Sequence, residues 1–265
     1  MPSPALTFEL VIDLHCHVLP GIDDGPGTIE ESVELARAAH RGGVRTIVAT
    51  PHVSAHYANE AATIEELVDQ VNARLVEEQI ALEVRPGAEI AITIISELDA
   101  QELERLRLAG SEWILLEPPF TPVAAGIDGA IFELHRAGHK VLLAHPERSP
   151  AFQREPKLLG DLARTGVLMS VTAGALAGRF GNTARRFALQ LFRDGLVHNV
   201  ASDAHDLVRR PPGIAEELAG ARLSGLKAWL TEEVPNAILS GDEIPAPPAR
   251  STARPRTHLG GWLRR

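Results

Sequence analysis

Two pairs of potential metal ligands occur in the sequence, and in each pair the two residues are separated by one position. They are His15 with His17 and Asp203 with His205. Side chains two positions apart on an extended chain point to the same side, so both members of a pair can reach one ion. Imidazole and carboxylate groups without a thiolate cluster favour Mn²⁺, Fe or Zn²⁺ over Ca²⁺ or a structural zinc–cysteine site.

Single histidines and acidic residues also follow short apolar runs elsewhere in the chain. Each one alone is better explained as an ordinary polar residue of the surface or core. However, six of the seven runs end in a His, Asp or Glu, and an unpaired carboxylate such as Glu117 is costly to bury. The repetition predicts a site with several metal ions, which favours hydrolysis. The additional candidates are His52, Glu89, Glu117 and His145.

Arginines close to these candidates indicate the kind of substrate. Arg148 follows His145 by three positions, and Arg209 and Arg210 follow His205 closely. A guanidinium group binds phosphate through a fork of N–H donors, although any single arginine could equally form a surface salt bridge. Two arginine segments near the candidate ligands therefore favour a phosphate ester as substrate.

These residues need a scaffold that brings the ends of separate strands together. Apolar runs alternate with amphipathic segments, which predicts a parallel α/β sheet, either a closed barrel or an open doubly wound sheet. In such folds the carboxyl ends of the strands share one face, where sites are assembled from several strands. The expected strands are residues 9–14, 45–49, 82–86, 113–116, 140–144, 167–171 and 197–201.

The amphipathic segments predict helices between these strands. Thr28 before Glu31, and Thr63 before Glu66, have the spacing of a capping box, in which side chains satisfy free N–H groups where a helix begins. No glycine-rich loop of a nucleotide-binding type follows a strand. The expected helices are residues 28–41, 63–79, 94–108, 129–137, 156–164 and 182–194.

Composition narrows the class of protein. The 265 residues carry a formal net charge of −9, which argues against nucleic-acid binding. We expect no membrane span and no secretory signal, and therefore a cytoplasmic protein. The single cysteine, Cys16, cannot form an intramolecular disulfide and lacks the phosphate loop of a cysteine-dependent phosphatase. We expect residues 1–241 to form a single domain and the Pro/Arg-rich residues 242–265 to form a mobile tail.

The chain resembles the polymerase and histidinol phosphatase (PHP) superfamily. Within it, the chain is most similar to the bacterial manganese-dependent protein tyrosine phosphatases linked to capsule and exopolysaccharide synthesis. The resemblance implies a distorted seven-stranded (β/α)7 TIM-like barrel of the PHP type. It rests on the segments IDLHCHVLPGIDDGPGTIEES, TIVATPH, PGAEI, ILLEPP, LLAHPER and ASDAH followed by RPP, between Ile12 and Pro212.

The resemblance also implies three divalent metal ions, with Mn²⁺ favoured and Fe or Zn²⁺ as alternatives. Arg148 and Arg210 would bind the substrate phosphate and act in catalysis. The implied ligands are His15, His17, Glu89 and Asp203 for the first ion, Glu89, Glu117 and His145 for the second, and Asp24, His52 and His205 for the third.

The implied activity is hydrolysis of phosphotyrosine on proteins by attack of a metal-activated hydroxide. The implied substrate is the tail of a bacterial tyrosine autokinase of exopolysaccharide synthesis. Two alternatives stay open, namely a small-molecule phosphatase of the same superfamily, such as a histidinol phosphatase, and a non-catalytic regulatory barrel. The complete set of nine ligand types argues against the regulatory barrel. The sequence leaves the oligomeric state open.

Overall fold

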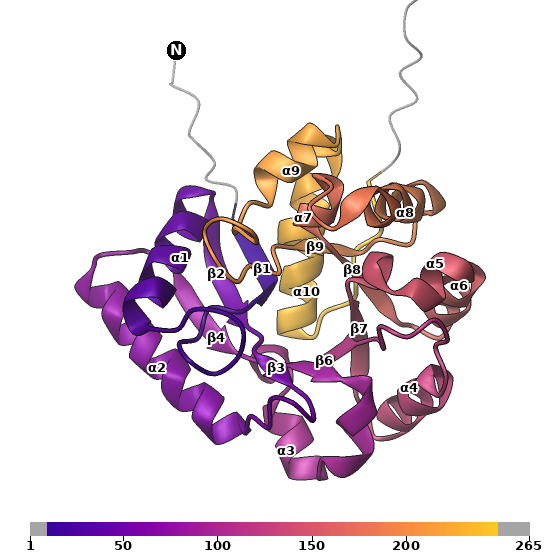
Figure 1. Ribbon diagram of the computed structural model, residues 1–265, viewed down its shortest axis with the longest axis horizontal. Coiled ribbons are helices and arrows are strands. Elements are labelled where there is room, and N and C mark those ends of the chain that lie inside the picture. The colour runs from indigo at the N-terminus through magenta and orange to yellow at the C-terminus, as the bar shows by residue number, and fades with distance from the viewer. Residues whose placement is uncertain (1–9, 249–265) are drawn as a thin grey trace, which may run out of the picture.

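The computed structural model describes residues 10–248, and residues 1–9 and 249–265 lie outside the described part. Strands alternate with helices, and the helices lie around the strands (Figure 1). All residues of the first and eighth strands are buried, as expected where a sheet is covered on both faces. The strands are β1 (Val11–Cys16), β2 (Val44–Ala49), β3 (His52–Val53), β4 (Glu83–Pro86), β5 (Glu89–Ala91), β6 (Trp113–Glu117), β7 (Lys140–Ala144), β8 (Leu168–Thr172) and β9 (Asn199–Ala201).

These strands form two parallel sheets, in the orders β1-β2-β4 and β3-β5-β6-β7-β8-β9. The neighbours β2 and β4 each break for two residues and continue as β3 and β5, which pair again. At the other end of the order, Cys16 of β1 forms a parallel bridge with Ala204, which follows β9. The carboxyl ends of strands from both sheets therefore meet in one region.

The seven predicted strands are all present; residues 140–144 match β7 at both ends, and the other six have at least one shifted end. The first begins at Val11 and continues to Cys16, so His15 lies inside the strand and not after it. The sequence analysis missed β3 and β5, because strands of two or three residues leave no periodic pattern.

The predicted helices are present with one exception. Residues 94–108 form a 3₁₀ turn (Ile92–Glu97) and a short helix α3, with a break between them. None of the helices in the described part is long and apolar enough to cross a membrane. The helices are α1 (Ile29–Arg41), α2 (Ala61–Glu77), α3 (Ala100–Arg105), α4 (Ile127–Arg136), α5 (Pro150–Arg154), α6 (Lys157–Arg164), α7 (Ala173–Leu176), α8 (Gly181–Asp194), α9 (Ala215–Gly220) and α10 (Val234–Ser240).

The two predicted capping boxes have different outcomes. At α1 the Thr28 hydroxyl accepts a hydrogen bond from the Glu31 amide at 3.3 Å, as predicted. The Thr63 cap is wrong, because α2 begins two residues earlier, at Ala61. The Ala61 amide donates to the Glu102 carboxylate of α3 at 2.6 Å, so a distant residue supplies the acceptor that the local sequence was expected to supply.

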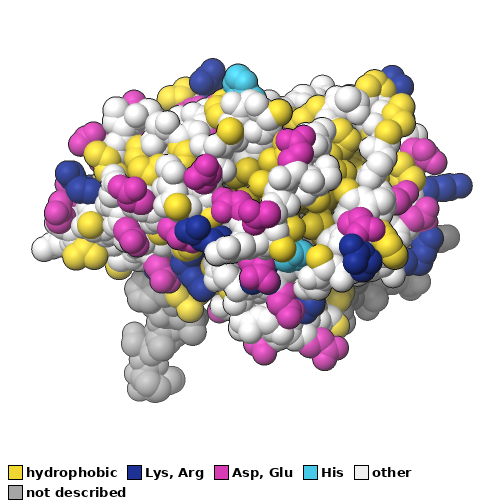
Figure 2. All heavy atoms as spheres, turned by 90° about the horizontal axis from the view of Figure 1, so that it is seen from below, with side chains coloured by type: hydrophobic (Ala, Val, Ile, Leu, Met, Phe, Trp, Pro, Cys, Tyr) yellow, Lys and Arg dark blue, Asp and Glu magenta, His cyan; other side chains and the backbone are white. Residues whose placement is uncertain are grey.

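The outer face carries an apolar hollow between α3 and α4. Figure 2 shows hydrophobic side chains gathered there among acidic ones. None of the nine candidate ligands lines this hollow, so the chemistry expected from the sequence belongs to a different part of the molecule. The hollow is lined by residues that include Ile92, Ile95, Leu98, Leu103 and Leu134.

The segment after α10 divides into two parts. Residues 242–248 have no regular structure, and the Trp229 indole N–H donates to the Pro245 carbonyl at 2.9 Å, which fixes this part against the domain. The rest of the predicted tail, residues 249–265, lies outside the described residues.

Candidate metal centre

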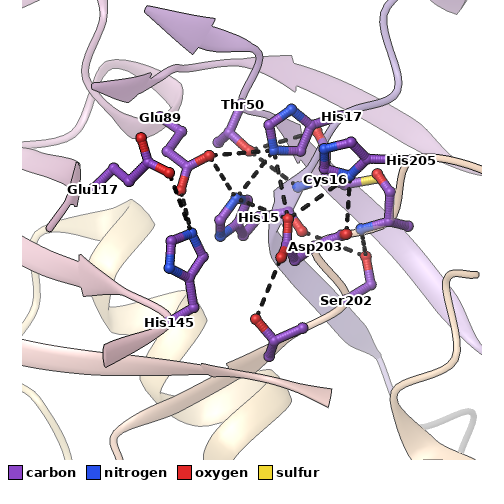
Figure 3. A network of polar contacts seen from close by, with 12 residues as sticks. His15, Cys16, His17, Thr50, Glu89, Glu117, His145, Ser202, Asp203 and His205 are labelled. Carbon is purple, nitrogen blue, oxygen red and sulfur yellow. Dashed lines mark hydrogen bonds and ion pairs between the residues drawn. The ribbon is translucent and has the colours of Figure 1, made fainter. Parts of the chain in front are cut away.

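Polar side chains converge where the carboxyl ends of the strands meet (Figure 3). Within the described part of the chain, four groups of His, Asp and Glu have their ligand atoms within 4.8 Å of one another. These groups contain all nine candidate ligands and no other residue. The members are His15, His17, Asp24, His52, Glu89, Glu117, His145, Asp203 and His205.

The four residues predicted for the first ion, His15, His17, Glu89 and Asp203, lie close together. The two histidine Nε2 atoms are 3.2 Å apart, and Glu89 Oε2 lies 3.3 and 3.4 Å from them. Asp203 Oδ1 lies 3.4 and 3.6 Å from the same two atoms. Ligands about 2.0–2.2 Å from one ion and placed tetrahedrally are about 3.3–3.6 Å apart. Each acid is thus close enough to both histidines to share an ion with them, although distance groups Glu89 with His15 and His17, and Asp203 with His15 and His145. The sharing of one ion by all four residues therefore stays a prediction.

The residues predicted for the third ion also lie together. Asp24 Oδ1 is 3.1 Å from His205 Nε2 and 3.4 Å from His52 Nε2. The Asp24 side chain is 47% exposed whereas that of His205 is 3% exposed, so the centre opens to solvent on the Asp24 side. The other ring nitrogen of His52 lies 3.0 Å from Glu89 Oε2, which connects this group to the first one.

The set predicted for the second ion is assembled only loosely. His145 Nε2 is 2.6 Å from Glu89 Oε1, which is a hydrogen-bond distance, and 3.9 Å from Glu117 Oε1. By distance, Glu89 and Glu117 group with His52, and His145 groups with His15 and Asp203. The sharing of a second ion among Glu89, Glu117 and His145 therefore stays a prediction.

Both predicted phosphate-binding arginines reach the centre, where each is paired with Asp203. Arg148 Nη1 donates to Asp203 Oδ2 at 2.7 Å, and Arg210 Nη2 donates to Oδ1 at 2.5 Å. Their side chains are 18% and 22% exposed, whereas that of Arg209 is 88% exposed. The structure thus places Arg210, and not its neighbour, at the site.

Asp23 is a residue that the sequence analysis missed. Its Oδ2 lies 2.6 Å from His17 Nδ1 and accepts the His52 amide at 3.1 Å, while Oδ1 accepts the Gly25 amide at 2.9 Å. A carboxylate behind a ligand histidine fixes the ring and leaves the other nitrogen free for a metal. Gly25 permits this arrangement, because a Cβ there would lie 2.6 Å from the His17 carbonyl oxygen. The only sequence signal is an acidic residue beside Asp24.

Three aromatic rings around the centre were also missed. Phe180 packs against the guanidinium of Arg148, 4.4 Å from the ring centre, and that of Arg210, at 5.9 Å. Tyr57 stacks on His52 with the ring centres 5.6 Å apart. Phe120 lies beside both Arg148 and the candidate ligand His145. The contacts of Phe180 and Phe120 join residues far apart in sequence, so no local pattern could have indicated them.

Ser202 and Cys16 are next to candidate ligands in the sequence, and the side chains of both are engaged away from the cluster. Ser202 Oγ donates to Asp13 Oδ2 at 2.5 Å. Cys16 Sγ is buried 3.9 Å from the Ala204 carbonyl oxygen. Burial, together with the charge of Asp13, raises the pKa of this thiol well above its usual range, which disfavours the reactive thiolate. Neither side chain is arranged to attack a substrate.

The charge state of the buried carboxylates depends on their neighbours. Burial alone would raise the pKa of Glu89, yet His15 and His145 hold it well below its usual range. Burial, reinforced by the charge of Glu89, raises the pKa of Glu117 to about 7. Glu89 is therefore ionised in the middle of the cluster, as a ligand shared between cations must be.

The surroundings also shift the pKa values of two histidines in opposite directions. Burial lowers the pKa of His17, but Asp23 more than offsets this and raises it to about 9. Burial and the charge of Arg148 lower the pKa of His145 to about 4. A metal ligand must be the neutral imidazole, so binding of a cation at His17 would displace a proton.

Two of the five non-glycine residues with positive φ in the described part of the chain are candidate ligands. His145 has φ 31° and Asp203 has φ 52°, both in the left-handed region that L-residues rarely adopt. The Asp203 amide donates to the His15 carbonyl at 2.7 Å, which helps to hold this conformation. Strain of this kind persists where the surroundings fix it, and it is common at functional sites.

Three buried polar atoms of the candidate ligands have no hydrogen-bond partner among the described residues, as expected of atoms that a metal ion could engage. Glu89 Oε2, His145 Nδ1 and His205 Nε2 are buried and make no hydrogen bond in the described structure. Imidazole and carboxylate groups in this arrangement suit Mn²⁺, Fe or Zn²⁺. The fold and the site therefore define a parallel α/β protein with a buried cluster of His, Asp and Glu side chains that could hold metal.

Comparison with known proteins narrows this class. The chain belongs to the capsular polysaccharide synthesis CpsB/CapC family, whose profile matches residues 11–223. It is 43% identical over 201 residues to the tyrosine-protein phosphatase YwqE of Bacillus subtilis strain 168, an alignment that covers 76% of this chain and 79% of that protein. It is 33% identical over 204 residues to the putative tyrosine-protein phosphatase CapC of Staphylococcus aureus, covering 76% and 79%.

Solved structures agree with this assignment. A crystal structure from a study of YwqE of Bacillus subtilis and CpsB of Streptococcus pneumoniae, described there as metal-dependent tyrosine phosphatases, matches with a TM-score of 0.79. That match has 36% identity and covers 89% of this chain and 98% of the other. A lactonase from Listeria monocytogenes matches with a TM-score of 0.50 and 12% identity, covering 88% and 89%, which shows a shared fold alone. The family-level resemblance predicted from the motifs is confirmed.

Proposed function

We propose that this protein is a metal-dependent phosphatase that hydrolyses phosphotyrosine on proteins. The observation that carries the proposal is the cluster of His15, His17, Glu89 and Asp203, in which each acid lies 3.3–3.6 Å from both histidine Nε2 atoms, with two arginines beside it. The relatives named as tyrosine-protein phosphatases support phosphotyrosine as the substrate class.

We further propose that the centre holds three divalent ions, with Mn²⁺ preferred and Fe or Zn²⁺ as alternatives. When bound, such ions polarise a phosphoryl oxygen, activate water and stabilise the leaving oxygen. The proposed ligands are His15, His17, Glu89 and Asp203 for the first, Glu89, Glu117 and His145 for the second, and Asp24, His52 and His205 for the third.

Arg148 and Arg210 are proposed to bind and orient the phosphate. A phosphate monoester brings close to two negative charges into a cleft lined by carboxylates, so it needs cationic partners. Each arginine uses one terminal nitrogen to hold Asp203, which leaves other N–H donors for the substrate. Arg210 Nε is buried and has no hydrogen-bond partner in the described structure, so it is one such donor.

Water is proposed to attack phosphorus directly. The hydroxyl of Ser202 is committed to Asp13, and the Cys16 thiol is buried away from the cluster. No side chain among these is available to carry the phosphoryl group. The phosphoryl group is therefore expected to pass to water in one step, without a phosphorylated protein intermediate.

The wider setting belongs to the same proposal. We place the protein in exopolysaccharide synthesis in the cytoplasm, with the phosphorylated tail of a bacterial tyrosine kinase as its substrate.

We also infer that residues 1–241 form one domain, with the two sheets as arcs of a distorted seven-stranded barrel. The continuation of β2 and β4 into β3 and β5, together with the Cys16–Ala204 bridge, supports this inference.

Relative turnover of two substrates tests the proposal. kcat/KM should be higher for a phosphotyrosine peptide than for histidinol phosphate, and a chelator should abolish both activities until Mn²⁺ is restored. A preference for histidinol phosphate would support the small-molecule alternative. Absence of metal-dependent turnover on either substrate would support the regulatory barrel.

A further inference from the structure

Phe120 lies at the edge of the metal centre and is half open to solvent. It follows Glu117 by three residues, in the connection from β6 to α4. Its ring stacks on the ring of His145, with the ring centres 5.6 Å apart and the planes at 27°. The Arg148 guanidinium lies 5.3 Å from the same ring centre. Even so, Phe120 remains 47% exposed.

The contacts of Phe120 do not by themselves explain a phenylalanine here. Arg148 is held more closely by Phe180, at 4.4 Å, and is anchored to Asp203 by a hydrogen bond. Isolated exposed hydrophobic residues are common on proteins, but this one presents an open aromatic surface beside a candidate phosphate-binding arginine. An aromatic ring in this place is suited to contact a substrate.

We propose that the exposed surface of Phe120 packs against the phenyl ring of the substrate and makes the centre selective for aryl phosphates over alkyl phosphates. This proposal rests on the proposed phosphatase function. In phosphotyrosine only the ester oxygen separates the phosphate from the ring. A phosphate held by Arg148 therefore brings the ring next to Phe120, within the distances of 4.5–7 Å at which aromatic pairs attract.

The size of the effect follows from the strength of such pairs. The contact between two aromatic rings, together with the apolar surface that it buries, changes the affinity for the substrate by about 10-fold. Replacing Phe120 by leucine removes the ring and keeps an apolar side chain. The change should raise KM for aryl phosphates and leave alkyl phosphates nearly unaffected.

Phenyl phosphate and glycerol phosphate are the probes for the test, used with the full chain and Mn²⁺. For F120L, KM for phenyl phosphate should rise about 10-fold, while kcat/KM for glycerol phosphate changes less than about two-fold. F120W, which keeps a ring, should restore the wild-type KM. Val123→Ala is the matched control, because Val123 lies in the same connection and is 67% exposed, and it should leave both values unchanged.

Two outcomes would overturn the proposal. Equal losses on the two phosphates would mean that Phe120 acts only by positioning Arg148 or His145, which is the behaviour expected of F180L because Phe180 contacts both arginines. Unchanged kinetics on phenyl phosphate would mean that the ring does not contact the substrate. If the wild-type protein hydrolyses neither ester, the proposed phosphatase function itself is wrong. That result differs from both outcomes above, in which the wild-type protein is active and only the role of Phe120 is refuted.

Discussion

Replacement of Asp23 by asparagine should weaken metal binding, although Asp23 is not itself a candidate ligand. The Asp23 side chain is fully buried, and its two oxygens serve three donors, which are His17 Nδ1 and the amides of His52 and Gly25. Asparagine has one acceptor oxygen, so its NH₂ group must face at least one of these donors whichever way the amide is turned.

The expected magnitude follows from these contacts. Loss of a partner behind a ligand histidine lowers metal affinity by about 10–100-fold, which is about 1.4–2.7 kcal/mol. Leaving one buried donor unpaired costs about 1–3 kcal/mol, in the same range. The affinity is measured by calorimetric titration of the metal-free protein with Mn²⁺, and circular dichroism checks that the fold is kept.

Asp99→Asn is the matched control for this change. Asp99 also accepts a backbone amide, that of Glu102 at 2.8 Å, but it does so as the N-cap of α3. Asparagine caps helices as well as aspartate, so metal affinity should stay at the wild-type value. Unchanged affinity in Asp23→Asn, or an equal loss in Asp99→Asn, would refute the role assigned to Asp23.

Three further predictions concern the arginines, the chemical step and pH. Arg210→Ala should lower kcat/KM on a phosphotyrosine peptide by about 10²–10³, the usual effect of losing one charged donor. Arg209→Ala should leave kcat/KM unchanged because its side chain is 88% exposed. The reverse pattern would show that Arg209, and not Arg210, binds the phosphate. Rapid-quench experiments with labelled substrate should detect no phosphorylated protein, and a trapped phosphoryl intermediate would contradict direct attack by water. Burial lowers the pKa of His198 from 6.5 to about 4, and its Nδ1 accepts a hydrogen bond from the Met169 amide at 3.2 Å. The neutral ring therefore stabilises the folded state above pH 6.5, and this contribution to the free energy of unfolding is lost as the pH falls towards 4. In urea unfolding with a chelator present, the wild-type protein should lose about 2 kcal/mol more than His198→Asn between pH 7 and pH 5; equal losses would contradict this.

The candidate site was more predictable from the sequence than the details of the fold. A ligand at the end of a buried parallel strand is marked both by its position and by the cost of burying it. The eight candidates found in this way converge in the described structure, together with Asp24, which only the family resemblance indicated. The strand ends were less predictable, since β1 reaches Cys16 and β3 and β5 are too short to show a period.

What the sequence could not indicate are contacts made only in three dimensions. Asp23 and Asp24 are adjacent and chemically identical, and only the loop conformation at Gly25 turns one towards His17 and the other towards the solvent side. The start of α2 depends on Glu102, 41 residues further on. Partners at such separations are set by packing and not by local pattern.

We propose that a metal centre shared through Glu89 performs the hydrolysis. Glu89 is fully buried, and its two oxygens lie 2.6–3.4 Å from ring nitrogens of His15, His17, His52 and His145. The most direct test is the number of metal ions per chain, measured by elemental analysis of wild-type and Glu89→Ala protein alongside turnover of a phosphotyrosine peptide. We expect the Glu89→Ala variant to fold, to hold fewer ions and to show no turnover. A variant that keeps the full metal content and full activity would contradict this proposal.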